Sequence, residues 1–119
     1  MADYKPFKHS EKQLQRSIVE ILELHDWYVC EYGKPGGHAA LRGAVPEGHS
    51  DLLVLKRLPT GPVAWFIEVK VPGKKPTPEQ WAFMDRMIQA GAKANVITCI
   101  EDLLVVLRSW GQEVKVEVR

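Results

Sequence analysis

Two apolar segments joined by a short connection constrain the fold of this chain more than any other feature. Residues 51–56 (DLLVLK) and 63–70 (VAWFIEVK) are rich in β-branched and aromatic residues, and RLPTGP between them favours a turn. The two segments therefore predict a β-hairpin. If the hairpin is regular and centred between Pro59 and Thr60, Asp51 lies opposite Glu68, with Cβ atoms about 4.5–5.5 Å apart.

Three helices are predicted, each from an apolar stripe that follows a capping-box pattern. They begin at Ser10, Thr77 and Thr98, and extend to about residues 25, 90 and 110. The capping pairs are Ser10 with Gln13, Thr77 with Gln80, and Thr98 with Glu101. The expected buried side chains of the last two helices are Trp81, Met84, Ile88, Leu103, Leu104, Leu107 and Trp110.

Further strands are predicted at residues 27–32, 94–98 and 113–118, the last from the alternation in EVKVEV. The order of helices and strands predicts an α/β fold, with a central mixed β-sheet flanked by helices. A length of 119 residues fits one domain over 1–119, with a frayed start at 1–9.

Charge and cysteine content narrow the function only slightly. Sixteen basic and fifteen acidic residues give a net charge of +1, so the distribution of charge matters more than its sum. No apolar run could span a bilayer, and the N-terminus is too polar for a signal peptide, so we expect a cytoplasmic protein without a membrane partner. Cys30 and Cys99 are predicted to be buried free thiols, and their spacing does not suit zinc.

Residues 33–50 (GKPGGHAALRGAVPEGHS) form the least regular segment, with five of the nine glycines and one acid, Glu47. Loops this long in a compact domain are usually functional or mobile. Together with the lysines of VPGKKP, the segment predicts a basic rim for phosphate contacts. The predicted DNA-binding residues are Lys34, Arg42, His49, Lys74 and Lys75. The alternatives are a solvated surface for the cations and a local hydrogen bond for His49.

Side chains at one end of the predicted hairpin suggest a metal site. Lys70 is two residues after Glu68 and shares its face, so it converges with Asp51 and Glu68. Oxygen ligands of this kind suit Mg²⁺ or Mn²⁺. Glu11 is centred on the apolar stripe of the first helix and is a candidate third carboxylate. The alternatives are a surface salt-bridge cluster at the hairpin and, for Glu11, a first-turn acid favoured by the helix dipole.

These residues resemble the PD-(D/E)XK nuclease superfamily, and within it the virus-type replication-repair nuclease (VRR-NUC) family. The resemblance covers nearly the whole chain. Its motifs are Ser10-Glu11-x-x-Leu14-Gln15, Gly48-His49-Ser50-Asp51-Leu52, Ile67-Glu68-Val69-Lys70, Thr77-Pro78-Glu79-Gln80 and the stretch 91–97. Ser50 stands where the superfamily motif has proline. The resemblance implies a restriction-endonuclease-like core and a stand-alone nuclease domain.

The resemblance also implies roles for individual residues. Asp51, Glu68 and the Val69 backbone carbonyl would hold Mg²⁺ or Mn²⁺, and Glu11 would bind the ion directly or through water. Lys70 would orient or help deprotonate the attacking water. Gln80 would position Lys70 or the scissile phosphate, although it could serve only as a cap.

The implied activity is metal-dependent, structure-selective DNA cleavage by a bacterial or phage-encoded enzyme, without a nucleotide cofactor. A two-fold homodimer would present two sites and could cut a Holliday junction symmetrically. The alternatives are a nuclease acting on flaps or on other branched or linear DNA, and an inactive nuclease-fold module that binds DNA or another partner.

Overall fold

The computed structural model describes residues 10–32 and 48–114. The predicted roles of Lys34 and Arg42, the frayed start at 1–9 and most of the predicted last strand lie outside these residues. Residues 113 and 114 do not form a strand. The elements in chain order are α1 (Glu11–Leu24), β1 (Tyr28–Glu31), β2 (Leu52–Leu58), β3 (Gly61–Val69), α2 (Pro78–Gln89), β4 (Lys93–Ile97) and α3 (Ile100–Ser109).

The strands form one sheet in the order β1-β2-β3-β4. β1 and β3 both pair antiparallel with β2, whereas β4 runs parallel to β3. The sheet is therefore mixed, and the predicted α/β class is confirmed. The β2–β3 register pairs Leu52 with Ile67 and Leu58 with Gly61, which is the register predicted from the sequence.

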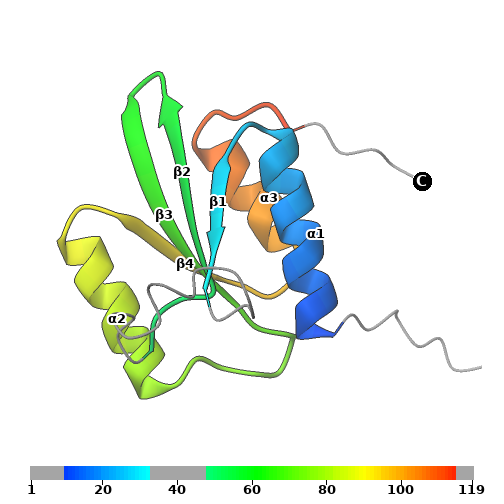
Figure 1. Cartoon of the computed structure of the whole chain (residues 1–119), viewed down its shortest axis with the longest axis vertical. Coiled ribbons are helices and arrows are strands. Elements are labelled where there is room, and N and C mark those ends of the chain that lie inside the picture. The colour runs from blue at the N-terminus through cyan, green and yellow to red at the C-terminus, as the bar shows by residue number, and fades with distance from the viewer. Residues whose placement is uncertain (1–9, 33–47, 115–119) are drawn as a thin grey trace, which may run out of the picture.

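Helices cover both faces of the sheet, with α1 and α3 on one side and α2 on the other (Figure 1). The larger core lies under α1 and α3, where apolar residues of both helices meet the inward face of the central strands. Complete burial of one such side chain stabilises the fold by about 1.5–3 kcal/mol. The fully buried members of this core are Ile18, Leu22, Leu52, Val54, Trp65, Ile67, Val69, Ile97, Leu103 and Leu107.

The helix starts follow the prediction in two of three cases. Ser10 and Thr77 are N-caps with complete capping boxes to Gln13 and Gln80. The capping box predicted at the start of α3 is wrong, because the N-cap is Cys99 and its side chain makes no cap hydrogen bond. Instead, the Asp102 carboxylate accepts hydrogen bonds from the Thr98 backbone N–H at 2.9 Å and from its hydroxyl at 2.7 Å. These bonds lower the pKa of Asp102, and a charged acceptor binds such donors more strongly than a neutral one.

The buried face of α2 differs from the prediction. Phe83 and Met84 are buried, but Trp81 and Ile88 are 53% and 51% exposed. The helix packs against the sheet by one side only, and in the described residues no element covers its outer side (Figure 1). Trp65, by contrast, is fully buried and packs edge-on against the Trp27 and Trp110 rings.

Two further predictions concern the cysteines and membrane-spanning helices. Cys30 and Cys99 are free, as predicted, but each is half-buried rather than fully buried. Within residues 10–32 and 48–114, no helix has the length and apolar character needed to cross a membrane.

Gly48 lies in the segment before β2 and is in close contact with the first turn of α2. Its φ is +82°, and a Cβ added here would lie 2.4 Å from the Glu79 carbonyl oxygen. Gly73 has a similar φ of +91°, but an added Cβ would meet nothing within 4 Å. The two glycines therefore share a left-handed backbone, which would strain any residue with a Cβ, and they differ only in the close approach to α2.

We predict that Gly73→Ala lowers the free energy of unfolding by about 1–2 kcal/mol, the cost of a left-handed backbone for a residue with a Cβ. Gly48→Ala should cost clearly more, because α2 must also move away. Urea unfolding of the two variants checks this difference. Equal losses would show that the contact with α2 contributes nothing.

Candidate active site

Asp51 lies where three strands meet. When the β2–β3 register is extended by one residue beyond the pair of Leu52 and Ile67, Asp51 lies opposite Glu68, as the sequence predicts. Its Oδ2 accepts a hydrogen bond from the Val69 backbone N–H at 2.8 Å, and its backbone carbonyl accepts one from the Tyr32 N–H at 2.9 Å. The carboxylate is therefore held by the ends of β2 and β3, next to the end of β1.

Glu68 is the buried partner of this carboxylate. The residue is only 1% exposed, and the Lys70 ammonium lies 3.5 Å from its Oε2. Its other oxygen, Oε1, is buried and has no hydrogen-bond partner among the described residues. Burial of an unsatisfied carboxylate oxygen is costly. Among the described residues, the site therefore lacks a cation or a hydrogen-bond donor for Oε1 of Glu68.

The proximity of the two carboxylates appears in their acid–base properties. Burial, and then the negative charge of Asp51, raise the pKa of Glu68 to about 7, while Lys70 acts in the opposite direction. Burial also raises the pKa of Asp51, against the hydrogen bond from Val69 and the charge of Lys70. In a metal-free site, Glu68 therefore keeps its proton to a higher pH than an ordinary carboxyl group does.

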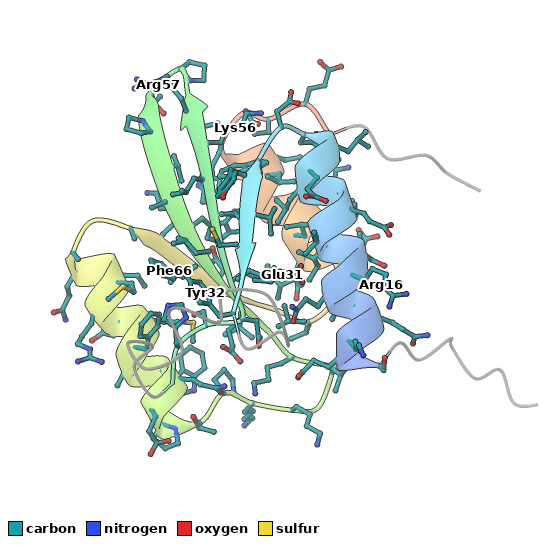
Figure 2. All side chains as sticks on the ribbon, viewed as in Figure 1. Arg16, Glu31, Tyr32, Lys56, Arg57 and Phe66 are labelled. Carbon is teal, nitrogen blue, oxygen red and sulfur yellow. The ribbon has the colours of Figure 1, made fainter. Side chains whose placement is uncertain are left out.

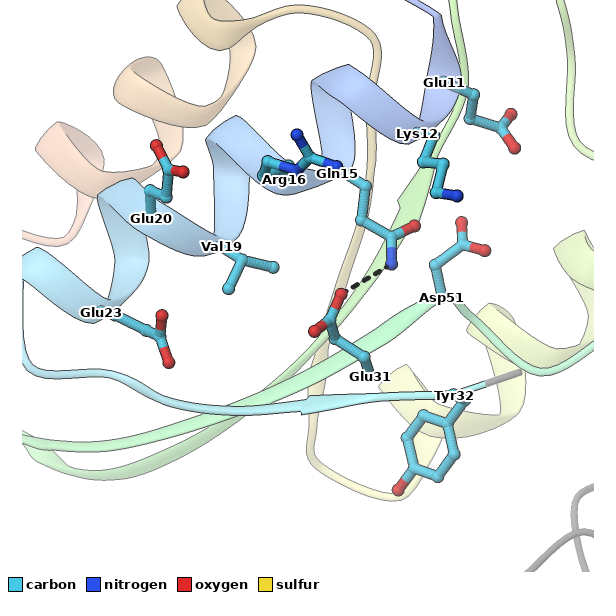
Figure 3. Close-up of a pocket in the computed structure, with 10 residues that line it drawn as sticks. All are labelled: Glu11, Lys12, Gln15, Arg16, Val19, Glu20, Glu23, Glu31, Tyr32 and Asp51. Carbon is cyan, nitrogen blue, oxygen red and sulfur yellow. Dashed lines mark hydrogen bonds between the residues drawn. The ribbon is translucent and has the colours of Figure 1, made fainter. Parts of the chain in front are cut away.

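Glu11 stands at the edge of the same site. It is exposed in the first turn of α1 and lines a hollow of about 650 Å³ together with Asp51 (Figure 3). Its charge contributes to the raised pKa of Glu68. The structure thus brings Glu11 near the pair, and its role as a ligand stays a prediction. Glu20 and Glu23 are exposed, as predicted.

Glu31 is a site residue that the sequence reasoning missed. It ends β1, pairs with Leu52, and accepts a hydrogen bond at 3.1 Å from the Gln15 side chain (Figure 3). Both residues line the hollow beside Asp51. Its position in the sequence could have indicated this role. An acidic residue at the end of an apolar strand that pairs with the central hairpin lies level with Asp51.

The donor set fits a hard divalent cation. Asp51 and Glu68 supply two neighbouring carboxylates, and one oxygen of Glu68 has no partner in the described residues. Across residues 10–32 and 48–114, no three acidic, histidine or cysteine side chains are close enough to form a ligand set. The Val69 carbonyl and water would have to complete it, and Mg²⁺ usually keeps several waters.

Gln80 and His49 both have structural tasks. The Gln80 side-chain oxygen accepts a hydrogen bond from the Thr77 N–H at 2.8 Å, so the cap uses this oxygen. The His49 ring lies between Tyr32 and Phe83, with centroids 4.1 and 4.5 Å away, and its Nδ1 is 2.8 Å from the Ser50 carbonyl. His49 thus helps to attach the residues before Asp51 to α2.

Of the remaining predicted DNA-binding residues, two lie within the described part of the chain. Lys74 and Lys75 are exposed in the connection between β3 and α2. Tyr32 and Phe66, which flank the His49 ring, lie at the end of the sheet near α2 (Figure 2). Lys34 and Arg42 fall outside the described residues.

Comparison with known proteins supports the fold. No family model and no curated protein sequence matches the chain. A solved structure titled "VRR_NUC domain" matches with a TM-score of 0.62 and 28% identity, over 82% of this chain and 94% of that one. A second, titled "VRR_NUC domain protein", matches with a TM-score of 0.64 and 18% identity, over 87% and 89%. At 18% identity, the second supports the fold alone.

A mixed sheet between helices, with paired carboxylates and a lysine at the end of its central hairpin, defines a nuclease-fold domain of the restriction-endonuclease type. Within that class, the chain is similar to VRR-NUC domains, the family that its sequence motifs resemble.

The raised pKa of Glu68 makes stability depend on pH. The folded protein keeps this proton up to a pH of about 7, whereas the unfolded chain loses it near 4.5. Between these values the unfolded chain binds fewer protons, so the free energy of unfolding falls as pH rises.

In metal-free protein, we predict that Glu68→Gln weakens this fall, whereas the exposed control Glu113→Gln leaves it unchanged. Unfolding across pH 4–8 measures the effect, and parallel wild-type and Glu68→Gln profiles would contradict it.

Proposed function

We propose that this protein is a metal-dependent, structure-selective DNA endonuclease that cuts four-way junctions as a homodimer. The observation that carries the proposal is the buried, unpartnered oxygen of Glu68, held beside Asp51 and Lys70. The family likeness supports a nuclease, and the chemistry of the site supports the metal.

The ligands for Mg²⁺ or Mn²⁺ would be the Asp51 and Glu68 carboxylates and the Val69 carbonyl, with Glu11 acting directly or through water. A divalent cation bound there lowers the pKa of a coordinated water and offsets charge on the phosphate. Asp51 is oriented for this task by the hydrogen bond from the Val69 N–H.

Lys70 is the residue that would act on the reacting water. Its ammonium is 3.5 Å from Glu68 and its side chain is 16% exposed, so it can reach both the carboxylate and a substrate. A lysine ammonium has three donors and can orient a water while it offsets the negative charge that develops on the phosphate. With its oxygen engaged in the cap, Gln80 has its amide nitrogen left to contact a phosphate.

Selectivity would come from DNA shape. The described residues contain only the helices and strands of the nuclease core, and none is added as a separate base-reading unit. One site cuts one strand, whereas a two-fold dimer places two sites symmetrically and matches the symmetry of a four-way junction. We propose a homodimer because symmetric cutting of a junction requires two active sites.

Cleavage of a labelled four-way junction, a flap and a linear duplex tests the proposal, with Mg²⁺ or Mn²⁺ present. We predict paired, symmetric nicks in the junction. Lys70→Ala should lower kcat by about 10²–10³-fold, the usual effect of removing one stabilising donor, while DNA binding persists. The exposed cation variant Arg108→Ala is the matched control and should cut normally.

Two other outcomes correct the proposal. Cutting of flaps or linear DNA alone would keep the metal site and reject junction resolution. No cutting of any substrate with either metal would favour a binding module without activity.

A further inference from the structure

The outer side of α1 carries charge in a defined order. Lys12 and Arg16 come first, one turn apart, and Glu20 and Glu23 follow toward the end of the helix. All four side chains are exposed, and all line the 650 Å³ hollow that includes Asp51. At one end of the hollow, Lys12 and Arg16 lie beside the carboxylates of Glu11 and Asp51, which the proposed function assigns to the metal ion. Glu20 and Glu23 lie at the other end, about 6 Å farther along the helix at a rise of 1.5 Å per residue.

The end that contains Lys12 and Arg16 is the one next to the candidate active site. Figure 3 shows the Lys12 side chain on the side of α1 that faces Asp51, while Glu20 and Glu23 lie farther along the helix. Neither Lys12 nor Arg16 takes part in an ion pair with another described residue. Both cations are therefore available to an anionic ligand.

Neighbouring groups limit what that ligand can be. Glu31 is hydrogen-bonded to Gln15 on the floor of the hollow, beside Lys12 and Arg16. Acids at the floor and at the far end make the hollow as a whole unsuited to a long run of phosphates. Among the described residues that line the hollow, Lys12 and Arg16 are the only cations, so they offer counter-charge for one phosphate group.

We propose that Lys12 and Arg16 bind a phosphate of the strand being cut, next to the scissile phosphate, and that Glu20 and Glu23 repel the phosphates that follow. This inference rests on the proposed function and specifies its substrate. A strand that enters over Lys12 and Arg16 must turn away from α1 before it reaches Glu20. DNA in which a strand leaves its duplex meets this demand, whereas a continuous straight duplex does not.

Binding measured by fluorescence anisotropy tests the phosphate contacts, with the full chain, a labelled four-way junction, no divalent metal and a series of salt concentrations. Each phosphate contact that is lost reduces the slope of log K against log salt by about 1. Lys12→Ala and Arg16→Ala should each do so and weaken binding by about tenfold. Lys93→Ala removes an exposed cation from β4 and is the matched control, with an unchanged slope.

The acidic end is tested with the double variant Glu20→Gln/Glu23→Gln. If these acids turn the strand away, their removal should tighten binding of linear duplex more than binding of the junction. Equal tightening of both would show a general charge effect and overturn the role in selection. Thermal unfolding of each variant confirms that it is folded.

The outcomes separate this inference from the proposed function. Unchanged salt slopes in both alanine variants would overturn the phosphate site, even if the wild type cuts junctions. Reduced slopes in a protein that cuts no DNA would keep the phosphate site and reject the nuclease.

Discussion

The hydrogen bond from the Val69 N–H to the Asp51 carboxylate joins the start of β2 to the end of β3, and the geometry of the site depends on it. It holds the Asp51 carboxylate in the register in which Asp51 faces Glu68, with Lys70 3.5 Å from Glu68. A slip of one residue would turn Glu68 and Lys70 toward the face covered by α1 and α3. Because the apolar residues at alternate positions fill that core, the core that stabilises the sheet also keeps the charged residues in place.

This arrangement has an electrostatic cost. Glu68 is buried, one of its oxygens has no partner in the described residues, and its pKa is raised to about 7 by burial and by Asp51. Lys70 compensates only part of the negative charge. The divalent cation that we propose would satisfy the free oxygen and both charges at once, and would thereby account for such a pair in the fold. Active sites commonly keep strain of this kind for function.

The sequence predicted the features that depend on local chemistry. The hairpin register follows from its turn, and two capping boxes follow from adjacent residues, so Asp51, Glu68 and Lys70 were brought together correctly. Tertiary packing decided the rest. Trp81 has helical periodicity suited to a core, yet it is exposed because α2 packs by one side only. Glu31 was missed because its approach to Asp51 depends on how β1 pairs with β2, which the local pattern does not state.

The most direct test of the metal site is anomalous diffraction from crystals soaked in Mn²⁺, compared between wild type and Glu68→Gln. We predict an anomalous peak between the Asp51 and Glu68 carboxylates in the wild type, absent in the variant. A wild-type site without a peak, or a peak bound elsewhere and unaffected by the substitution, would contradict the claim that this pair exists to hold a divalent cation.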